Sequence, residues 1–131
     1  MSVHQDSPAV AIARAHVEAW SNHDFDQARS SLAADIKVTA TTTNPFIKDT
    51  GLTGVDDYMR GLIEFAQAVV PGSLRVIAST GDAHNALLML TVQATLGPGG
   101  APVTLPGTRL YLTDEDGRIT VEQVVFYAAQ D

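Results

Sequence analysis

The second half of the chain places the strongest limit on the fold, because after Pro71-Gly72 it consists of strand-forming runs separated by short turns. Glycine, proline and aspartate supply the backbone angles that tight turns need. Three turn runs divide this half: Gly81-Asp82, Gly97-Pro98-Gly99-Gly100 and Asp114-Glu115-Asp116-Gly117. We therefore predict four strands, over residues 74–79, 83–96, 101–113 and 118–129. Because their connections are short, neighbouring strands should run antiparallel.

The first seventy residues show helical spacing instead. Ser7-Pro8 is typical of a helix start, with a capping side chain followed by proline in the first turn. Asp24, with Gln27 three residues later, has the form of a capping box. Pro71-Gly72 ends the last helical pattern. We predict helices over residues 8–21, 25–32 and 55–69, a short strand over 36–41 and a loop over 42–54.

This order of elements is typical of an α+β domain. The late strands are long, since ~13 residues at about 3.3 Å each span on the order of 40 Å. A twisted sheet of such strands curls, and Pro106-Gly107 within the third late strand predicts a bulge or an edge feature. Three helices covering a curled sheet leave a hollow between the two layers.

Composition supports one globular domain and excludes several classes of protein. The chain has 131 residues, of which 45% are hydrophobic, and a net charge of −7 without a Lys/Arg run. That balance argues against binding to nucleic acid or an anionic membrane, and no apolar stretch approaches the ~20 residues that span a bilayer. Residues 1–7 lack the pattern of a signal peptide. We predict a disordered leader over residues 1–7, a single domain over residues 8–131 and a cytoplasmic location.

Three local stretches add a family resemblance. The run at residues 18–26 (EAWSNHDFD) resembles a junction between a long helix and a second helix. Leu52-Thr53-Gly54 resembles the small-residue entry to a third helix, and residues 114–119 resemble a last hairpin turn. Over about residues 8–128 the chain thereby resembles the NTF2-like superfamily, which includes SnoaL-like and ketosteroid isomerase-like proteins. The resemblance implies a cystatin-like cone, in which a strongly curved antiparallel sheet wraps around helices and encloses an apolar pocket.

The catalytic carboxylates of that superfamily are missing at the matching positions. The oxyanion Tyr, the general-base Asp and the protonated Asp of ketosteroid isomerases fall on His16, Ala40 and Arg109. The Asp of SnoaL-type cyclases falls on Val125, and the Asp-Arg-Asp group of the epoxide hydrolases is not visible. Steroid-type isomerisation is therefore not expected, and the resemblance leaves the reaction open.

The last two strands supply another set of polar residues. Pairing around the final turn places Tyr111 opposite Glu122 and Arg109 opposite Val124, and strand alternation places Arg109, Tyr111 and Glu122 on one face. Composition alone makes the opposite, Leu/Val-rich face the core. The resemblance instead directs the polar face into the pocket and leaves the apolar face for a dimer contact. We favour the second interpretation, because monomers rarely expose a continuous apolar patch and homodimers commonly cover one.

Four residues carry the candidate chemistry. His16 titrates near neutrality and suits a general acid or base, although a buried histidine bonded to a carbonyl is the structural alternative. Arg109 with Glu122 suits polarisation of a substrate oxygen and proton transfer, or else forms a structural ion pair. Tyr111 suits hydrogen bonding to a carbonyl. The predicted catalytic residues are His16, Arg109, Tyr111 and Glu122. The predicted ligand-binding residues are Trp20, Phe46, Met59 and Phe126.

Neither a metal nor another cofactor is predicted. The four histidines show no metal-ligand spacing, and the glycine-rich run at 97–100 is not followed by a lysine or a helix. Two functions stay open. One is a cofactor-independent isomerase, cyclase, dehydratase or hydrolase acting on a hydrophobic molecule with a carbonyl or epoxide. The other is a non-catalytic ligand-binding or dimerisation module. Both predict a small hydrophobic ligand and a homodimer through the outer face of the sheet.

Overall fold

The computed structural model describes residues 6–96 and 99–129. Within these residues it contains three helices and six strands. The helices are α1 (Pro8–Ser21), α2 (Phe25–Ser30) and α3 (Val55–Ala66). The strands are β1 (Leu32–Thr42), β2 (Thr50–Thr53), β3 (Arg75–Gly81), β4 (Asn85–Ala94), β5 (Val103–Thr113) and β6 (Ile119–Phe126). Of the predicted leader, residues 1–5 lie outside the described part, whereas Asp6 is placed by an ion pair with Arg14.

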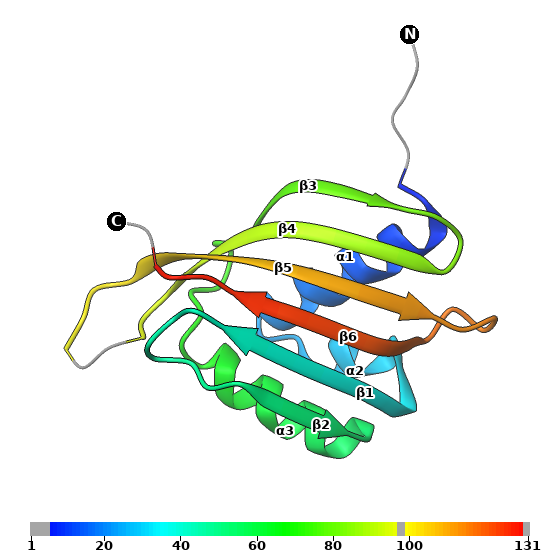
Figure 1. Ribbon diagram of the computed structural model, residues 1–131, viewed down its shortest axis with the longest axis horizontal. Coiled ribbons are helices and arrows are strands. Elements are labelled where there is room, and N and C mark those ends of the chain that lie inside the picture. Colours follow the sequence, from blue (N-terminus) through cyan, green and yellow to red (C-terminus); the bar gives the residue numbers. More distant parts are fainter. Residues whose placement is uncertain (1–5, 97–98, 130–131) are drawn as a thin grey trace, which may run out of the picture.

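All six strands form one curved sheet in the order β2-β1-β6-β5-β4-β3. Figure 1 shows the helices together on one side of this sheet, and α1 packs on β4 while α3 packs on β1. The predicted antiparallel pairing of β3, β4, β5 and β6 is confirmed. The β1–β6 pair is parallel, as a connection through most of the chain permits. The structure is thus the α+β, cystatin-like architecture that was expected.

The helix starts are set by the local sequence. Ser7 Oγ accepts a hydrogen bond from the Val10 N–H at 3.3 Å, and Asp24 Oδ1 accepts one from the Gln27 N–H at 3.3 Å. These bonds satisfy N–H groups that a helix start leaves unpaired. The first helix has the predicted bounds, whereas α3 ends at Ala66, three residues before the predicted end.

Two predictions for the strands were wrong. The segment predicted as a loop over 42–54 contains β2, an edge strand of four residues that pairs with β1. A strand this short, with a glycine inside it, shows no period that the sequence could reveal. The first strand begins at Leu32 and not at Ile36, because Leu32 pairs with Ile119 of β6. Ala33, Ala34 and Asp35, residue types with low strand propensity, lie in a register shift between Leu32 and Lys37.

The predicted bulge at Pro106-Gly107 was also wrong. Both residues pair regularly with β4, and β5 lies inside the sheet and not at its edge. The Pro106 carbonyl accepts a hydrogen bond from the Tyr127 N–H, just beyond the end of β6. In an antiparallel strand the N–H of a residue points to the same side as its carbonyl, here toward β6. Because β6 has already ended at this point, the N–H that proline lacks removes no hydrogen bond between strands.

Side chains along β5 and β6 alternate between buried and more exposed, and the buried ones include the polar residues that were predicted to point into the pocket. Tyr111 pairs with Glu122 and Arg109 with Val124. Arg109, Tyr111 and Glu122 are buried on the face that the helices cover, while Leu110 and Leu112 point to the other face and are half-buried. We call these the inner and the outer face. The polar face therefore points inward, and the prediction to that effect is confirmed.

Candidate functional site

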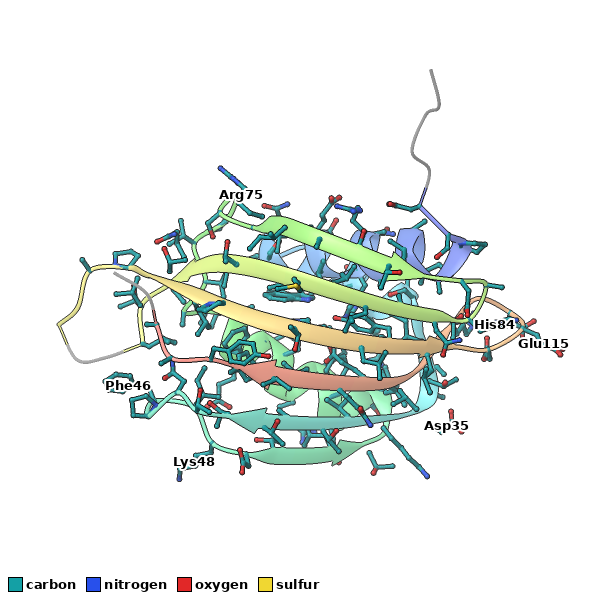
Figure 2. All side chains as sticks on the ribbon, turned by 45° about the horizontal axis from the view of Figure 1, so that its top comes forward. Asp35, Phe46, Lys48, Arg75, His84 and Glu115 are labelled. Atoms are coloured by element: carbon teal, nitrogen blue, oxygen red, sulfur yellow. The ribbon has the colours of Figure 1, made fainter. Side chains whose placement is uncertain are left out.

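A cavity of about 510 Å³ lies between the inner face of the sheet and α3. Its wall is mainly apolar, formed by Val38, Leu52, Leu62, Phe65, Val124 and Phe126. Phe46 and Lys48 also line it and are exposed. Figure 2 shows both at one end of the molecule, in the connection between β1 and β2. The cavity therefore opens at that end.

The deep end of the cavity is polar. Tyr58 from α3, Arg109 from β5 and Glu122 from β6 line it, and all three are buried. An apolar wall leading to a few convergent polar groups is the usual form of a small-molecule site. A ligand that fills this cavity would place its apolar part toward the opening and an oxygen or nitrogen atom against these three groups.

A chain of hydrogen bonds leads from Glu122 away from the cavity. The Tyr58 hydroxyl lies 2.8 Å from Glu122 Oε1, and His16 Nε2 lies 3.1 Å from the same hydroxyl. On the other side of its ring, His16 Nδ1 lies 2.9 Å from the carbonyl oxygen of Ala28. His16 does not line the cavity, so it reaches the cavity only through Tyr58.

Arg109 is held by charge and by aromatic rings. Its Nη1 lies 3.6 Å from Glu122 Oε2, with both side chains almost fully buried. Its guanidinium lies over the ring of Trp20 at 4.8 Å and that of Phe126 at 5.5 Å. Stacking on aromatic faces stabilises a cation when water is excluded. The positive charge is therefore fixed in position beside the carboxylate.

Several buried polar atoms at this end have no hydrogen-bond partner among the described residues. They are Arg109 Nε and Glu122 Oε2, whose residues line the cavity, and the Tyr111 hydroxyl, Trp20 Nε1 and Thr113 Oγ1, whose residues do not. A buried polar group without a partner costs about 1–3 kcal/mol. The Arg109 and Glu122 atoms are thus suited to receive a polar atom of a ligand or a water molecule.

Burial shifts the protonation of the groups behind the cavity. It lowers the pKa of His16, although the nearby negative charge of Glu122 opposes the shift. Burial, reinforced by the same carboxylate, raises the pKa of Tyr58 and of Tyr111 well above the ordinary value. Burial acts to lower the pKa of Arg109, but Tyr111 and Glu122 outweigh it and the net shift is upward. Both tyrosines are therefore neutral donors and Arg109 is a permanent cation.

The predicted site residues divide into two groups. Arg109, Glu122, Phe46 and Phe126 line the cavity, while His16, Tyr111, Trp20 and Met59 do not. Tyr111 packs edge-on against the His16 ring with centroids 5.9 Å apart, and Trp20 lies beneath the guanidinium. Met59 is part of the hydrophobic core. Trp20 and Met59 were predicted to contact a ligand, but neither residue lines the cavity.

Sequence reasoning missed Tyr58. This residue belongs to the helix predicted over residues 55–69, in which the apolar Val55, Met59 and Leu62 recur at helical spacing. Its hydroxyl is the link between His16 and Glu122. The available signal was a tyrosine on an otherwise apolar helix face, since a buried tyrosine hydroxyl usually finds a polar partner.

Two further observations concern metals and membranes. In the described ranges, no group of three or more His, Asp or Glu residues is arranged to hold a metal ion. Among the same residues, no helix has both the length and the apolar character needed to cross a membrane.

Solved structures share this architecture. A protein from Kribbella flavida DSM 17836 is 27% identical with a TM-score of 0.74, covering 92% of this chain and 88% of its own. An epoxide hydrolase of the LEH-like type from Mycobacterium tuberculosis is 21% identical with a TM-score of 0.68, covering 91% and 82%. Another M. tuberculosis protein, in complex with estradiol-17beta-hemisuccinate, is 15% identical with a TM-score of 0.71, covering 91% and 93%. No curated protein matches the sequence.

A family model also matches most of the sequence. The model of the SnoaL-like domain matches residues 13–122, a range that extends from α1 to Glu122 in β6 and includes the polar cavity residues Tyr58, Arg109 and Glu122. The structural neighbours have the same NTF2-like and cystatin-like folds. The chain therefore belongs to the SnoaL-like domain family and has the NTF2-like fold.

Proposed function

We propose that this protein is a cofactor-independent acid/base enzyme acting on a small hydrophobic molecule that carries a carbonyl or an epoxide. One observation carries the proposal. Glu122 and Arg109 lie side by side at the deep end of an apolar cavity, each with a buried polar atom that has no hydrogen-bond partner among the described residues. A carboxylate and a fixed cation in a water-poor pocket are suited to moving a proton while stabilising the charge that develops.

The two groups would divide the work on a carbonyl substrate. Arg109 would donate a hydrogen bond to the carbonyl oxygen, and Glu122 would remove a proton from the adjacent carbon. The electron pair of that C–H bond would move toward the oxygen, where Arg109 stabilises the negative charge. Return of the proton to the same or to another carbon would give exchange or isomerisation. Elimination or ring closure would follow from the same anion.

An epoxide would use the same groups in another order. Glu122 in its protonated form would give its proton to the ring oxygen as the C–O bond breaks, and a water molecule would add to the carbon and return one proton to the Glu122 carboxylate. The neighbours support this range of chemistry, since one is an epoxide hydrolase and another binds a steroid ester. The cavity volume of about 510 Å³ is also within the ~300–1,000 Å³ that is usual for small-molecule sites.

The alternative function is a non-catalytic ligand-binding module. One observation favours it, namely that His16 and Tyr111 are sealed behind the cavity. These groups stabilise the interior without reaching a ligand. Under this alternative the protein binds the same class of molecule but transfers no proton.

The outer face of the sheet supports a further part of the proposal, a homodimer. Ile77, Leu87, Met89 and Tyr127 are exposed there, with exposed fractions between 40% and 64%. Large apolar patches on monomers usually mark an interaction surface, and a two-fold symmetric contact would cover one on each subunit. A cytoplasmic location stays a prediction.

Hydrogen exchange at carbon tests the function directly. We would dissolve 2-tetralone, a cyclic benzylic ketone with acidic α-hydrogens, in deuterated buffer and follow the loss of its α-proton NMR signals. The enzyme should accelerate this loss, and Glu122→Gln should reduce the acceleration by about 10²–10⁴-fold, the usual contribution of a positioned acid or base. Glu115→Gln is the matched control, because this residue is exposed in a turn far from the cavity (Figure 2). Styrene oxide would test the epoxide reaction in the same way.

The outcomes separate the two functions. Saturable binding of 2-tetralone without exchange or hydrolysis would favour the binding module. Exchange that Glu122→Gln leaves unchanged would remove Glu122 from the chemistry. If neither probe perturbs the resonances of residues that line the cavity, the assignment of the cavity as the site is wrong.

A further inference from the structure

We propose that His16, Tyr58 and Glu122 form a proton relay, which stores one exchangeable proton behind the cavity and passes it between His16 and Glu122 through the Tyr58 hydroxyl. The inference rests on the proposed function in one respect, that Glu122 is the group facing the substrate. It adds that His16, which touches no ligand, supplies and receives the proton that Glu122 uses.

The position of one proton follows from the surroundings of His16 Nδ1. This nitrogen lies 2.9 Å from the Ala28 carbonyl oxygen, which can only accept. Ser31 Oγ is 3.2 Å from Nδ1, but its hydroxyl donates to the same Ala28 oxygen. An unprotonated Nδ1 would therefore place a lone pair against a carbonyl oxygen without a hydrogen between them. Nδ1 consequently carries a hydrogen in every state of the relay.

The two remaining contacts need two protons, and Tyr58 brings one. Its hydroxyl lies between His16 Nε2, at 3.1 Å, and Glu122 Oε1, at 2.8 Å. If Tyr58 donates to Glu122, then Nε2 must carry a hydrogen, which makes His16 a cation. If Tyr58 donates to Nε2, then Glu122 must carry the hydrogen and His16 is neutral. Both contacts of the Tyr58 hydroxyl can be hydrogen bonds only when His16, Tyr58 and Glu122 together carry one proton more than a neutral histidine, a neutral tyrosine and a carboxylate would.

The groups around the relay favour its two states in opposite ways. Arg109 Nη1, 3.6 Å from Glu122 Oε2, favours the carboxylate and thereby the cation on His16. Burial favours the neutral histidine and lowers the pKa of His16. The other groups facing the His16 ring are Tyr111 from β5, edge-on at 5.9 Å, and Tyr58 from α3. Neither tyrosine carries a charge that would decide between the two states.

The relay would connect the cavity to a proton held on His16, a residue that a ligand in the cavity cannot reach. Starting with the cation on His16, the Nε2 hydrogen moves to Tyr58 while the Tyr58 hydrogen moves to Glu122, and Glu122 gives its hydrogen to the substrate. One N–H bond is broken, one substrate–hydrogen bond forms, and His16 ends neutral. When Glu122 acts as a base, the same steps run in reverse. A single carboxyl group could in this way both donate and accept within one reaction.

Nuclear magnetic resonance of the ligand-free protein tests the relay. The nitrogen signal of His16 Nε2 and the side-chain carboxyl carbon signal of Glu122 would be followed between pH about 4 and 8, a range that includes the ordinary histidine pKa of about 6.5 and lowered values. A shared proton should leave in one step, so that both signals report the same midpoint. In Tyr58→Phe the two signals should no longer report one midpoint, because the charge–charge interaction remains but the bridge is gone.

Control variants keep the test decisive. Glu115→Gln should change neither signal. If Tyr58→Phe does not fold, His16→Gln removes the store instead, and the Glu122 signal should then lose the step that it shares with His16. Separate midpoints in the unaltered protein, no step in this range, or a common midpoint that survives Tyr58→Phe would each overturn the relay. A protein with the shared proton but no 2-tetralone exchange would refute only the proposed function.

Discussion

The inner and outer faces of β5 and β6 reverse the usual distribution of polar and apolar side chains. The inner face buries Arg109, Tyr111 and Glu122, while the outer face leaves Leu110 and Leu112 half-exposed beside the exposed Met89. Burying a charge is unfavourable unless it is paired and hydrogen-bonded. Exposing apolar side chains forgoes stabilisation that burial would give. A sheet with both features is organised around a polar site inside and a contact surface outside.

The two faces should therefore respond differently to the same kind of change. On the inner face, removing one polar partner leaves the other buried without compensation. On the outer face, comparable changes should leave the monomer folded and alter only its association. Each of the following predictions compares a change on one face with a matched change elsewhere.

The largest effect should come from dividing the buried ion pair. Arg109→Met leaves Glu122 with an uncompensated charge, and such a change usually costs about 3–5 kcal/mol of unfolding free energy. Arg75→Met, at an exposed position labelled in Figure 2, should stay within about 0.5 kcal/mol. Urea unfolding measures both. The double variant Arg109→Met/Glu122→Leu should recover much of the loss, because no charge is then left buried. A single variant as stable as the unaltered protein would show that the pair is not buried in solution.

A charge on the outer face should affect association more than folding. Met89→Glu would place like charges near each other across a symmetric contact and weaken the dimer by about 2–4 kcal/mol. The free energy of unfolding of the monomer should change by only about 0.5 kcal/mol. Sedimentation of the variant beside the unaltered protein measures the association. If the unaltered protein is already a monomer at micromolar concentration, the outer face is not a dimer contact.

The same tyrosine substitution can be made on both sides of the sheet, in helix α3 on the inner side and after β6 on the outer side. Tyr58→Phe removes the hydroxyl that bridges His16 and Glu122 and should cost about 1–3 kcal/mol, the penalty for leaving buried partners unsatisfied. Tyr127→Phe, at a position that is 40% exposed on the outer face, should be within about 0.5 kcal/mol of the unaltered protein. Thermal or urea unfolding gives the comparison. Equal effects of the two substitutions would contradict the polar organisation of the inner face.

The smallest effect concerns pH. Burial makes the pKa of folded His16 lower than its ordinary value of 6.5, so the unfolded chain binds more protons just below that pH. Stability should then be lost as the pH falls from about 6.5 toward the lowered pKa, by up to about 1.4 kcal/mol per pH unit. The corresponding contribution should be absent in His16→Gln. Unfolding curves at several pH values measure the slope, and identical slopes for the two proteins would show that His16 is not held neutral.

Much of the fold could be predicted from the chain because its signals are local. The caps at Ser7 and Asp24 and the turn around Gly117 depend on a few adjacent residues, and the predicted elements form at those places. The pairing of Tyr111 with Glu122 also follows from the turn between β5 and β6. The edge strand β2 could not be predicted, because its four residues take strand form only through pairing with β1.

The candidate site was predicted only in part for a related reason. Arg109 and Glu122 belong to neighbouring strands, so strand alternation brings them to one face. Tyr58 lies 64 positions from Glu122 in the chain, and no local pattern indicates that their side chains meet. The contact arises only when α3 packs on the sheet.

The amino-acid sequence by itself determined the order of the helices and of every strand except β2, the register of the last two strands and the residues that share each face, because period and turn chemistry act over a few residues. Only the tertiary structure decided which face is inside, that His16 lies behind Tyr58 and not at the cavity, and that Arg109 is stacked on Trp20. Those features depend on how distant elements pack, since burial and hydrogen bonding between them are properties of the assembled fold.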